Sequence, residues 1–236
     1  MTEWRARRFW ADATVEPVAG GHAVRLDGRP VRTPAKTLLV VPTRALAAGV
    51  ADEWRAQGEV IDPLSMPLTR AANATMDKVI PQRAAVVAEL AGYGASDLLC
   101  YRAEGPDELR ARQDAGWDPM LDWADVTLGA RLAVTQGVMP TPQPANAVEA
   151  LRARVDGLSP WVLTALSEFV SLSGSLVLGL AAVARARAPE ALWDLSRIDE
   201  TWQAEEWGED EEEAARIAAR RTAFLQADRY LGLLDA

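Results

Sequence analysis

Apolar and polar positions alternate in the first forty residues, as is typical of strands that bury one face. The alternation runs over residues 9–15 and again over 24–27, and it ends in the dipeptide Asp27-Gly28, a strong hairpin signal. Short strands are also expected near Val31 and over residues 38–41. Meandering hairpins need a helix or a second sheet to cover one face, so the next segment should supply one.

From residue 43 the spacing of apolar residues changes to that of a helix. Leu46, Val50 and Trp54 recur every four residues, between a Thr43 N-cap and a stop at Gly58. This spacing places the three side chains on one helix face, which we expect to lie against the hairpin sheet. Trp54 is therefore predicted to be a structural residue packed under that sheet.

The rest of the chain has a helical pattern, and strand signals are scarce. Prolines and glycines divide it, because proline fits the first helical turn and glycine often ends a helix. The expected helices cover about 68–79, Pro81 to Gly92 or Gly94, Pro106 onward with a restart at Pro119, 161–183, Pro189 to Trp207, and the acids after Gly208 to about Leu234. A proline-rich loop is expected over residues 137–146.

This order of elements predicts an α+β fold class with two domains. Residues 1–85 should form an α+β domain of β-hairpins and helix, and residues 86–236 an all-helical domain. The charge changes near the same place. Residues 1–95 carry 12 basic and 10 acidic side chains, whereas residues 96–236 carry 13 basic and 24 acidic ones.

The composition excludes several classes of function. The net charge is −9 at pH 7, which argues against nucleic-acid binding, because phosphate backbones are bound by Lys and Arg. One His and one Cys rule out an internal disulfide and leave too few ligands for an ordinary zinc site. His22 stands beside a Gly-Gly turn and Cys100 among leucines, which favours a turn residue and a small core residue over catalytic groups.

The most apolar segment, residues 161–183, is long enough to be considered as a membrane span. It contains Glu168 and four serines, so a buried helix without membrane insertion is predicted instead. The N-terminal residues lack the apolar core of a secretory signal. Together with the single thiol, these features predict a cytoplasmic location.

Carboxylates are the remaining candidates for chemistry. The chain has no P-loop and no Gly-x-Gly-x-x-Gly motif, so neither a nucleotide nor another cofactor is predicted. The segment Asp199–Glu213 holds nine acids and no basic residue. It lacks the His of a di-iron site and the spacing of a calcium loop, so no metal is predicted either. The acids after Gly208 suit the first turn of a helix, but those before it lie at a helix end, where the dipole disfavours them.

An ordered set of motifs runs along nearly the whole chain. These are RFW, LDGRPVRTP, ADEWRAQGEVIDP, MPLTRAANATMDKV, SDLLCYRAEGPDELRARQDAGWDPMLDWA and DETWQAEEWGEDEEE. None is a catalytic signature, but their order and spacing resemble the assembly chaperone of the F-type ATP synthase soluble head that handles the alpha subunit. The resemblance extends from about Arg7 to Leu234 and is to a bacterial relative of the mitochondrial assembly factor.

The resemblance implies a non-enzymatic chaperone that binds the free ATP synthase alpha subunit until the beta subunit replaces it. It also implies a sandwich-like first domain and an orthogonal helical bundle. The functionally sensitive acid of the family precedes a Trp-Gly dipeptide, where this chain offers Asp199 and Glu200. The implied partner-binding residues are Asp199, Glu200, Trp202, Gln203, Glu206, Trp207, Gly208 and Glu209. Charge reversal at Asp199 or Glu200 should weaken client binding with little change in stability.

Two other functions remain open. A carboxylate-dependent enzyme acting on a small polar substrate could pair Glu200 with Glu206 or Glu209, although no nucleophile, metal cluster or phosphate loop accompanies these acids. An adaptor for other basic protein surfaces is a third hypothesis.

Overall fold

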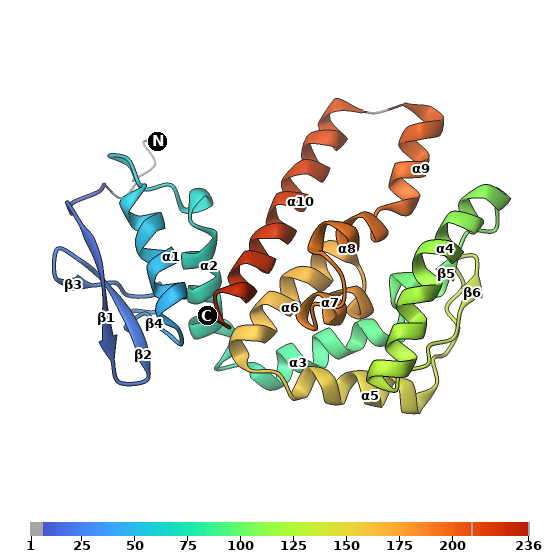
Figure 1. The fold of residues 1–236 in the computed structure, drawn as a ribbon, viewed down its shortest axis with the longest axis horizontal. Coiled ribbons are helices and arrows are strands. Elements are labelled where there is room, and N and C mark those ends of the chain that lie inside the picture. The colour runs from blue at the N-terminus through green and yellow to red at the C-terminus, as the bar shows by residue number, and fades with distance from the viewer. Residues whose placement is uncertain (1–6, 209, 236) are drawn as a thin grey trace. The chain divides into compact units, whose positions relative to one another are not determined.

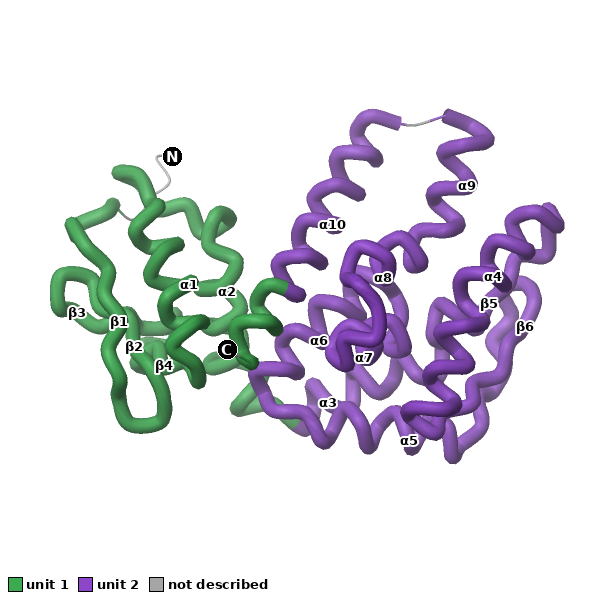
Figure 2. Tube along the Cα trace, viewed as in Figure 1, with its two compact units in different colours: residues 1–83, 229–236 green, residues 84–228 purple. Residues whose placement is uncertain are grey.

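The computed structural model describes residues 7–208 and 210–235. The fold class is α+β, as predicted, with a small N-terminal sheet followed by helices (Figure 1). The chain divides into two compact units, coloured separately in Figure 2. Unit 1 contains residues 1–83 and 229–236, and unit 2 contains residues 84–228. In this division residues 229–235 fall in unit 1, whereas the sequence analysis placed them in the helical domain 86–236.

Unit 1 is built on a four-stranded antiparallel sheet in its described part. Strand β2 pairs with β1 over its whole length, and its other edge pairs with β3 and β4. The elements are β1 (Ala13–Val18), β2 (Gly21–Leu26), β3 (Arg29–Pro30), β4 (Val40–Val41), α1 (Arg44–Arg55) and α2 (Pro67–Ala74), followed by a π-helical turn (Thr75–Val79).

The hairpin and the first helix form where the sequence predicts them. Asp27 and Gly28 have φ of 47° and 80° and turn the chain between β2 and β3. The hydroxyl oxygen of Thr43 accepts a hydrogen bond from Leu46 N at 3.1 Å, which caps α1. Helix α1 contacts β1 and β2 and buries Leu46 and its neighbours against them. It therefore covers the sheet as expected.

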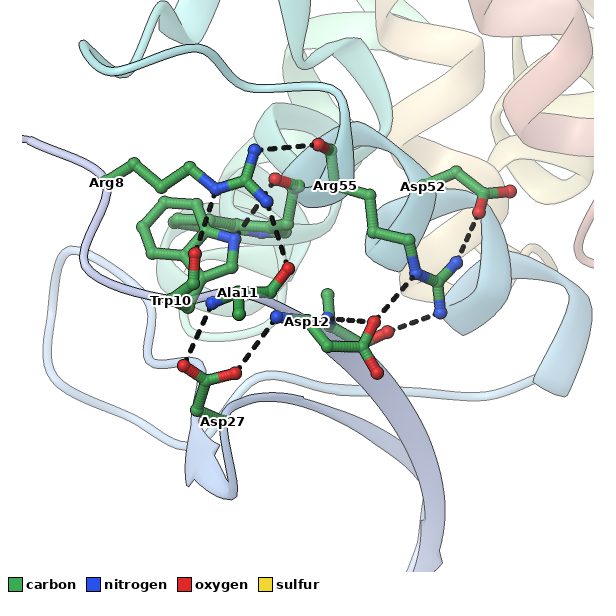
Figure 3. Close-up of polar contacts among 9 residues, drawn as sticks. Arg8, Trp10, Ala11, Asp12, Asp27, Asp52 and Arg55 are labelled. Carbon is green, nitrogen blue, oxygen red and sulfur yellow. Dashed lines mark hydrogen bonds and ion pairs between the residues drawn. The ribbon is translucent and has the colours of Figure 1, made fainter.

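Polar contacts fasten the N-terminal segment to the end of α1 (Figure 3). The Arg8 guanidinium donates to the carbonyl oxygens of Trp10, Ala11, Arg55 and Gln57. The Asp27 carboxylate accepts from the backbone N–H groups of Asp12 and Ala11, each at 2.9 Å, and these bonds lower the pKa of Asp27. The hairpin turn, the segment before β1 and the last carbonyls of α1 are thus joined in one network.

Unit 2 is mainly helical, with a two-strand parallel pair that the sequence did not predict. Its elements are α3 (Arg83–Gly92), β5 (Tyr101–Arg102), α4 (Asp107–Trp123), β6 (Thr135–Gln136), α5 (Ala145–Asp156), α6 (Pro160–Ser173), α7 (Leu176–Val183), α8 (Pro189–Leu195), α9 (Ile198–Trp207) and α10 (Glu211–Gly232). The first residue of α3 and the last four of α10 are assigned to unit 1. In the core, Phe224 of α10 packs on Phe169 of α6 and Trp193 of α8, with ring centroids 4.8 and 5.7 Å apart.

The helices differ from the prediction in several places. Helix α5 was not expected, and the expected helix from Pro189 to Trp207 forms two, α8 and α9. The apolar segment forms two helices, because Gly174 takes a left-handed conformation at φ 75° and Ser175 caps α7 by accepting from Leu178 N at 3.0 Å. Pro119 does not restart a helix but lies inside α4, where the buried side chains of Trp117 and Met120 hold both sides of it in the core. In the described ranges, no helix combines the length and apolar character needed to cross a membrane.

Candidate functional site

The acidic segment forms nearly all of α9, a short connection and the start of α10, all within unit 2. Asp199 and Glu200 lie in the first turn of α9, where the helix dipole favours acids, and not at a helix end as the sequence suggested. Every residue of α9 is described and none is fully buried. The helix ends at Gly208, whose φ of 88° suits glycine, and whose N–H donates to Ala204 O at 2.9 Å. Asp210 accepts from Glu213 N at 2.9 Å, so it caps α10, while Glu209 lies outside the described residues.

One face of α9 lies against α4. Asp199 Oδ1 accepts a hydrogen bond from Gln113 Nε2 at 2.6 Å. Farther along α9, the Arg112 guanidinium forms an ion pair with Glu205 at 2.6 Å and lies over the Trp202 ring, 4.6 Å from its centroid. Asp199 and Trp202, two of the predicted partner-binding residues, are therefore engaged by α4.

A different face carries Glu200, Gln203 and Trp207, because residues three and four apart share a side of a helix. Glu200 pairs with Arg197 at 2.8 Å. The Arg197 side chain lies over the Trp193 ring, and burial lowers the pKa of its guanidinium, an effect that Glu200 opposes. Gln203 is exposed, and Trp207 is 80% exposed. The charge of Glu200 is thus partly neutralised, whereas Trp207 faces solvent.

The exposed acids gather where α9 and α10 meet. We call Glu206, Trp207, Gly208, Asp210, Glu211 and Glu212 the hairpin tip. Within the described part of the chain, Glu206, Glu211 and Glu212 form no ion pair, unlike Glu205 with Arg112 and Glu213 with Arg216. An exposed indole among unpaired carboxylates is suited to an apolar protein surface bordered by basic side chains.

The other candidates do not assemble into a reactive centre. Glu200 and Glu206 are six residues apart on one helix, so they leave its axis at directions about 120° apart and do not converge. Burial raises the pKa of the Cys100 thiol to about 12, which leaves very little reactive thiolate at neutral pH. His22 lies in β2 and pairs with Val41, inside the strand rather than in the turn. Among the described residues, no three His, Cys, Asp or Glu side chains gather as a metal site.

Trp54 is half-buried on α1 in unit 1. Its ring meets that of Trp10 edge to face at 5.1 Å, and its carbonyl oxygen accepts from Trp10 Nε1 at 3.2 Å. The structure thus places it beside the N-terminal segment.

Sequence reasoning missed Arg112 and Gln113, the α4 residues that hold α9. They precede the acidic segment by more than eighty residues, and nothing in the acidic segment points to them. The one available signal was the helical spacing of Gln113, Gly116 and Trp117, which places them on a common face of α4.

Comparison with known proteins identifies relatives along the chain. The model of the ATP12 chaperone protein family matches residues 7–125. The crystal structure of Atp12 from Paracoccus denitrificans is 50% identical, with a TM-score of 0.94, and the match covers 98% of this chain and 100% of that one. A mutant of P. denitrificans Atp12p with lysine in place of an aspartate is 49% identical, with a TM-score of 0.95 and coverage of 99% and 100%. The mitochondrial protein atp12 of Schizosaccharomyces pombe is 24% identical over 216 residues, which is 86% of this chain and 74% of the relative.

Proposed function

The chain belongs to the ATP12 chaperone family, and on that premise we propose that it is an assembly chaperone of the F-type ATP synthase head. It binds the free alpha subunit and holds it until the beta subunit takes its place. The observation that carries the binding part of this proposal is the hairpin tip. There Trp207 is 80% exposed and the neighbouring Glu206, Glu211 and Glu212 lack ion-pair partners among the described residues.

The chemistry of the tip suits a client that must be released. Charge complementarity speeds encounter and orients the partners more than it adds affinity, so a contact of this kind can be exchanged for a permanent one. A partly exposed Trp supplies the apolar anchor that dominates many interfaces. Glu200 and Gln203 extend the proposed contact along α9 from the tip.

The proposal includes three further points. The chain works as a chaperone and not as an enzyme, because Glu200 and Glu206 diverge and the thiol of Cys100 is buried. Client binding needs no nucleotide, in keeping with the missing P-loop. The location is cytoplasmic, which the single cysteine and the likeness to a bacterial protein support.

The test is capture of the alpha subunit of the same organism by the full chain, without nucleotide. We expect a soluble complex that suppresses aggregation of the alpha subunit, and release when the beta subunit is added. Trp207→Ala should weaken capture about thirtyfold, the loss that corresponds to about 2 kcal/mol at an interface anchor. Glu206→Lys should lower the association rate and the dependence of that rate on salt.

Val126→Ala is the matched control, since Val126 is an exposed apolar residue of unit 2 outside the hairpin tip. It should bind the client as the wild type does. Normal capture by Trp207→Ala would exclude the tip as the contact. A wild-type chain that leaves the alpha subunit aggregating would exclude the function itself, and equal capture of unrelated basic proteins would favour an adaptor.

A further inference from the structure

The Gln113 side chain of α4 links the segment that follows β5 to helix α9. It is 1% exposed, so in the folded chain it is out of reach of another protein. Its Oε1 accepts a hydrogen bond from Ala103 N at 2.8 Å, and its Nε2 donates to Asp199 Oδ1 at 2.6 Å. The first bond fixes the orientation of the amide, because a backbone N–H can be met only by the oxygen end. The nitrogen end therefore faces α9 and requires an acceptor at residue 199.

Further contacts near the Gln113–Asp199 hydrogen bond hold the start of α9 against α4. Trp117 Nε1 donates to Leu195 O at 2.7 Å, just before α9 begins. Gly116 lets the two helices approach closely, since a Cβ there would lie 2.7 Å from Ile198 Cδ1. Beyond Asp199, α9 makes an ion pair and a cation–π contact with α4, both through Arg112, with Glu205 and Trp202, and these side chains are partly exposed. With no fully buried residue of its own, α9 depends on these few contacts for its direction.

We propose that Gln113 and Asp199 are positioning residues, whose hydrogen bond sets the direction of α9 and thereby places Glu206 and Trp207 for the client. Asp199 acts through Gln113 and not by touching the client. The test by client binding rests on the proposed function, because it measures capture of the alpha subunit. It assigns to Asp199 a role different from that of the tip residues with which the sequence grouped it.

The direct test reverses donor and acceptor in the Gln113–Asp199 hydrogen bond, first one residue at a time and then both together. Gln113→Glu sets a carboxylate oxygen against the Asp199 carboxylate, and Asp199→Lys sets an ammonium against the Gln113 amide donor. Each should weaken capture of the alpha subunit about tenfold, the equivalent of one lost buried hydrogen bond. The double variant Gln113→Glu/Asp199→Lys restores a donor and an acceptor, and should recover binding to within about threefold of wild type. Asp199→Asn keeps the Oδ1 acceptor and should bind nearly as the wild type does.

A second readout does not need the client. Spin labels at Glu108→Cys on α4 and Glu206→Cys on α9 report the distance between the two helices, and the buried Cys100 thiol stays unlabelled. Gln113→Glu should shift or broaden the distance distribution, and the double variant should return it to that of the wild-type background. Melting temperatures of all variants show which of them are folded, and the Asp199→Asn and double variants keep the test decisive if a single charge change prevents folding.

The outcomes separate this inference from the proposed function. If Gln113→Glu captures the client normally, or if the double variant stays as weak as Asp199→Lys, Asp199 touches the client itself and the positioning role is wrong. An unchanged distance in Gln113→Glu also overturns it. If the wild-type chain fails to capture the alpha subunit while the label distance responds and recovers as expected, the proposed function fails and the positioning of α9 by Gln113 stands.

Discussion

Trp54 carries an indole N–H that is buried with no hydrogen-bond partner among the described residues, although its ring is well placed against Trp10. A buried donor without a partner opposes folding, while the edge-to-face contact favours it. The side chain is half-buried, so its contribution is smaller than the one expected for a fully enclosed Trp.

We predict that Trp54→Ala lowers the free energy of unfolding by about 2–3 kcal/mol, somewhat less than the loss typical of a fully buried Trp. Trp54→Phe keeps a ring against Trp10 and removes the unpaired N–H, so it should stay within about 1 kcal/mol of wild type. Urea unfolding measures both. Equal losses in the two variants would show that the ring contact with Trp10 does not stabilise the fold.

At the scale of elements, α2 is capped from another helix. Its own N-cap residue, Met66, offers no side-chain hydrogen bond. Instead the Glu53 carboxylate of α1 accepts from Leu68 N at 2.7 Å, and from Thr69 N and Thr69 Oγ1 at 2.8 and 2.7 Å. A carboxylate at a helix N-terminus also meets the positive end of the helix dipole. Glu53 thus joins α1 to α2.

Glu53→Gln should lower the free energy of unfolding by about 1–3 kcal/mol, because one end of the amide would set a donor against the donors of α2. Asp52→Asn is the control. Asp52 is the adjacent acid, exposed on the same helix, and its ion pair with Arg55 is worth at most about 1 kcal/mol. A loss in Asp52→Asn as large as that in Glu53→Gln would indicate a general charge effect in place of a cap.

Local signals predicted the elements better than they predicted the site. Asp27-Gly28 and Thr43 act within a few residues, so the hairpin and the start of α1 were readable in the sequence. Gly174 and Ser175 carry a stop and a cap, but they stand inside an apolar run whose continuity favoured one helix. The location of the acidic hairpin was also readable. Its division into a face held by α4 and a free tip was not, because Gln113 lies more than eighty residues away from Asp199 in sequence.

At the scale of the whole molecule, the chain completes unit 1 with residues from its far end. Tyr230 is 2% exposed, and its hydroxyl lies 3.1 Å from Thr75 Oγ1. Thr43 Oγ1 donates to Leu233 O at 2.5 Å. Six residues before Tyr230 on the same helix, Phe224 belongs to the core of unit 2. Helix α10 thus contributes to two cores.

Two substitutions on α10 should therefore act on different units. Tyr230→Ala should lower the hydrogen-exchange protection of β1, β2 and α1, with a loss of about 3–5 kcal/mol of local stability. Phe224→Ala should lower protection first in α6 and α8. Hydrogen exchange followed by mass spectrometry of peptides measures both patterns. Identical patterns from the two variants would mean that the chain unfolds as one cooperative body.

Because the end of α10 belongs to unit 1, that unit can be completed only late in translation. A ribosome adds about 5–20 residues per second, so roughly 7–30 s separate the synthesis of Arg83 from that of Arg229. Throughout that time the sheet and α1 lack Tyr230 and Leu233, while the helices of unit 2 are synthesised one after another. Domains usually fold in the order in which they are synthesised, N-terminal first, but unit 1 cannot be completed before all residues of unit 2 have been made. The unit whose residues are mostly made first is thus the one that is completed last.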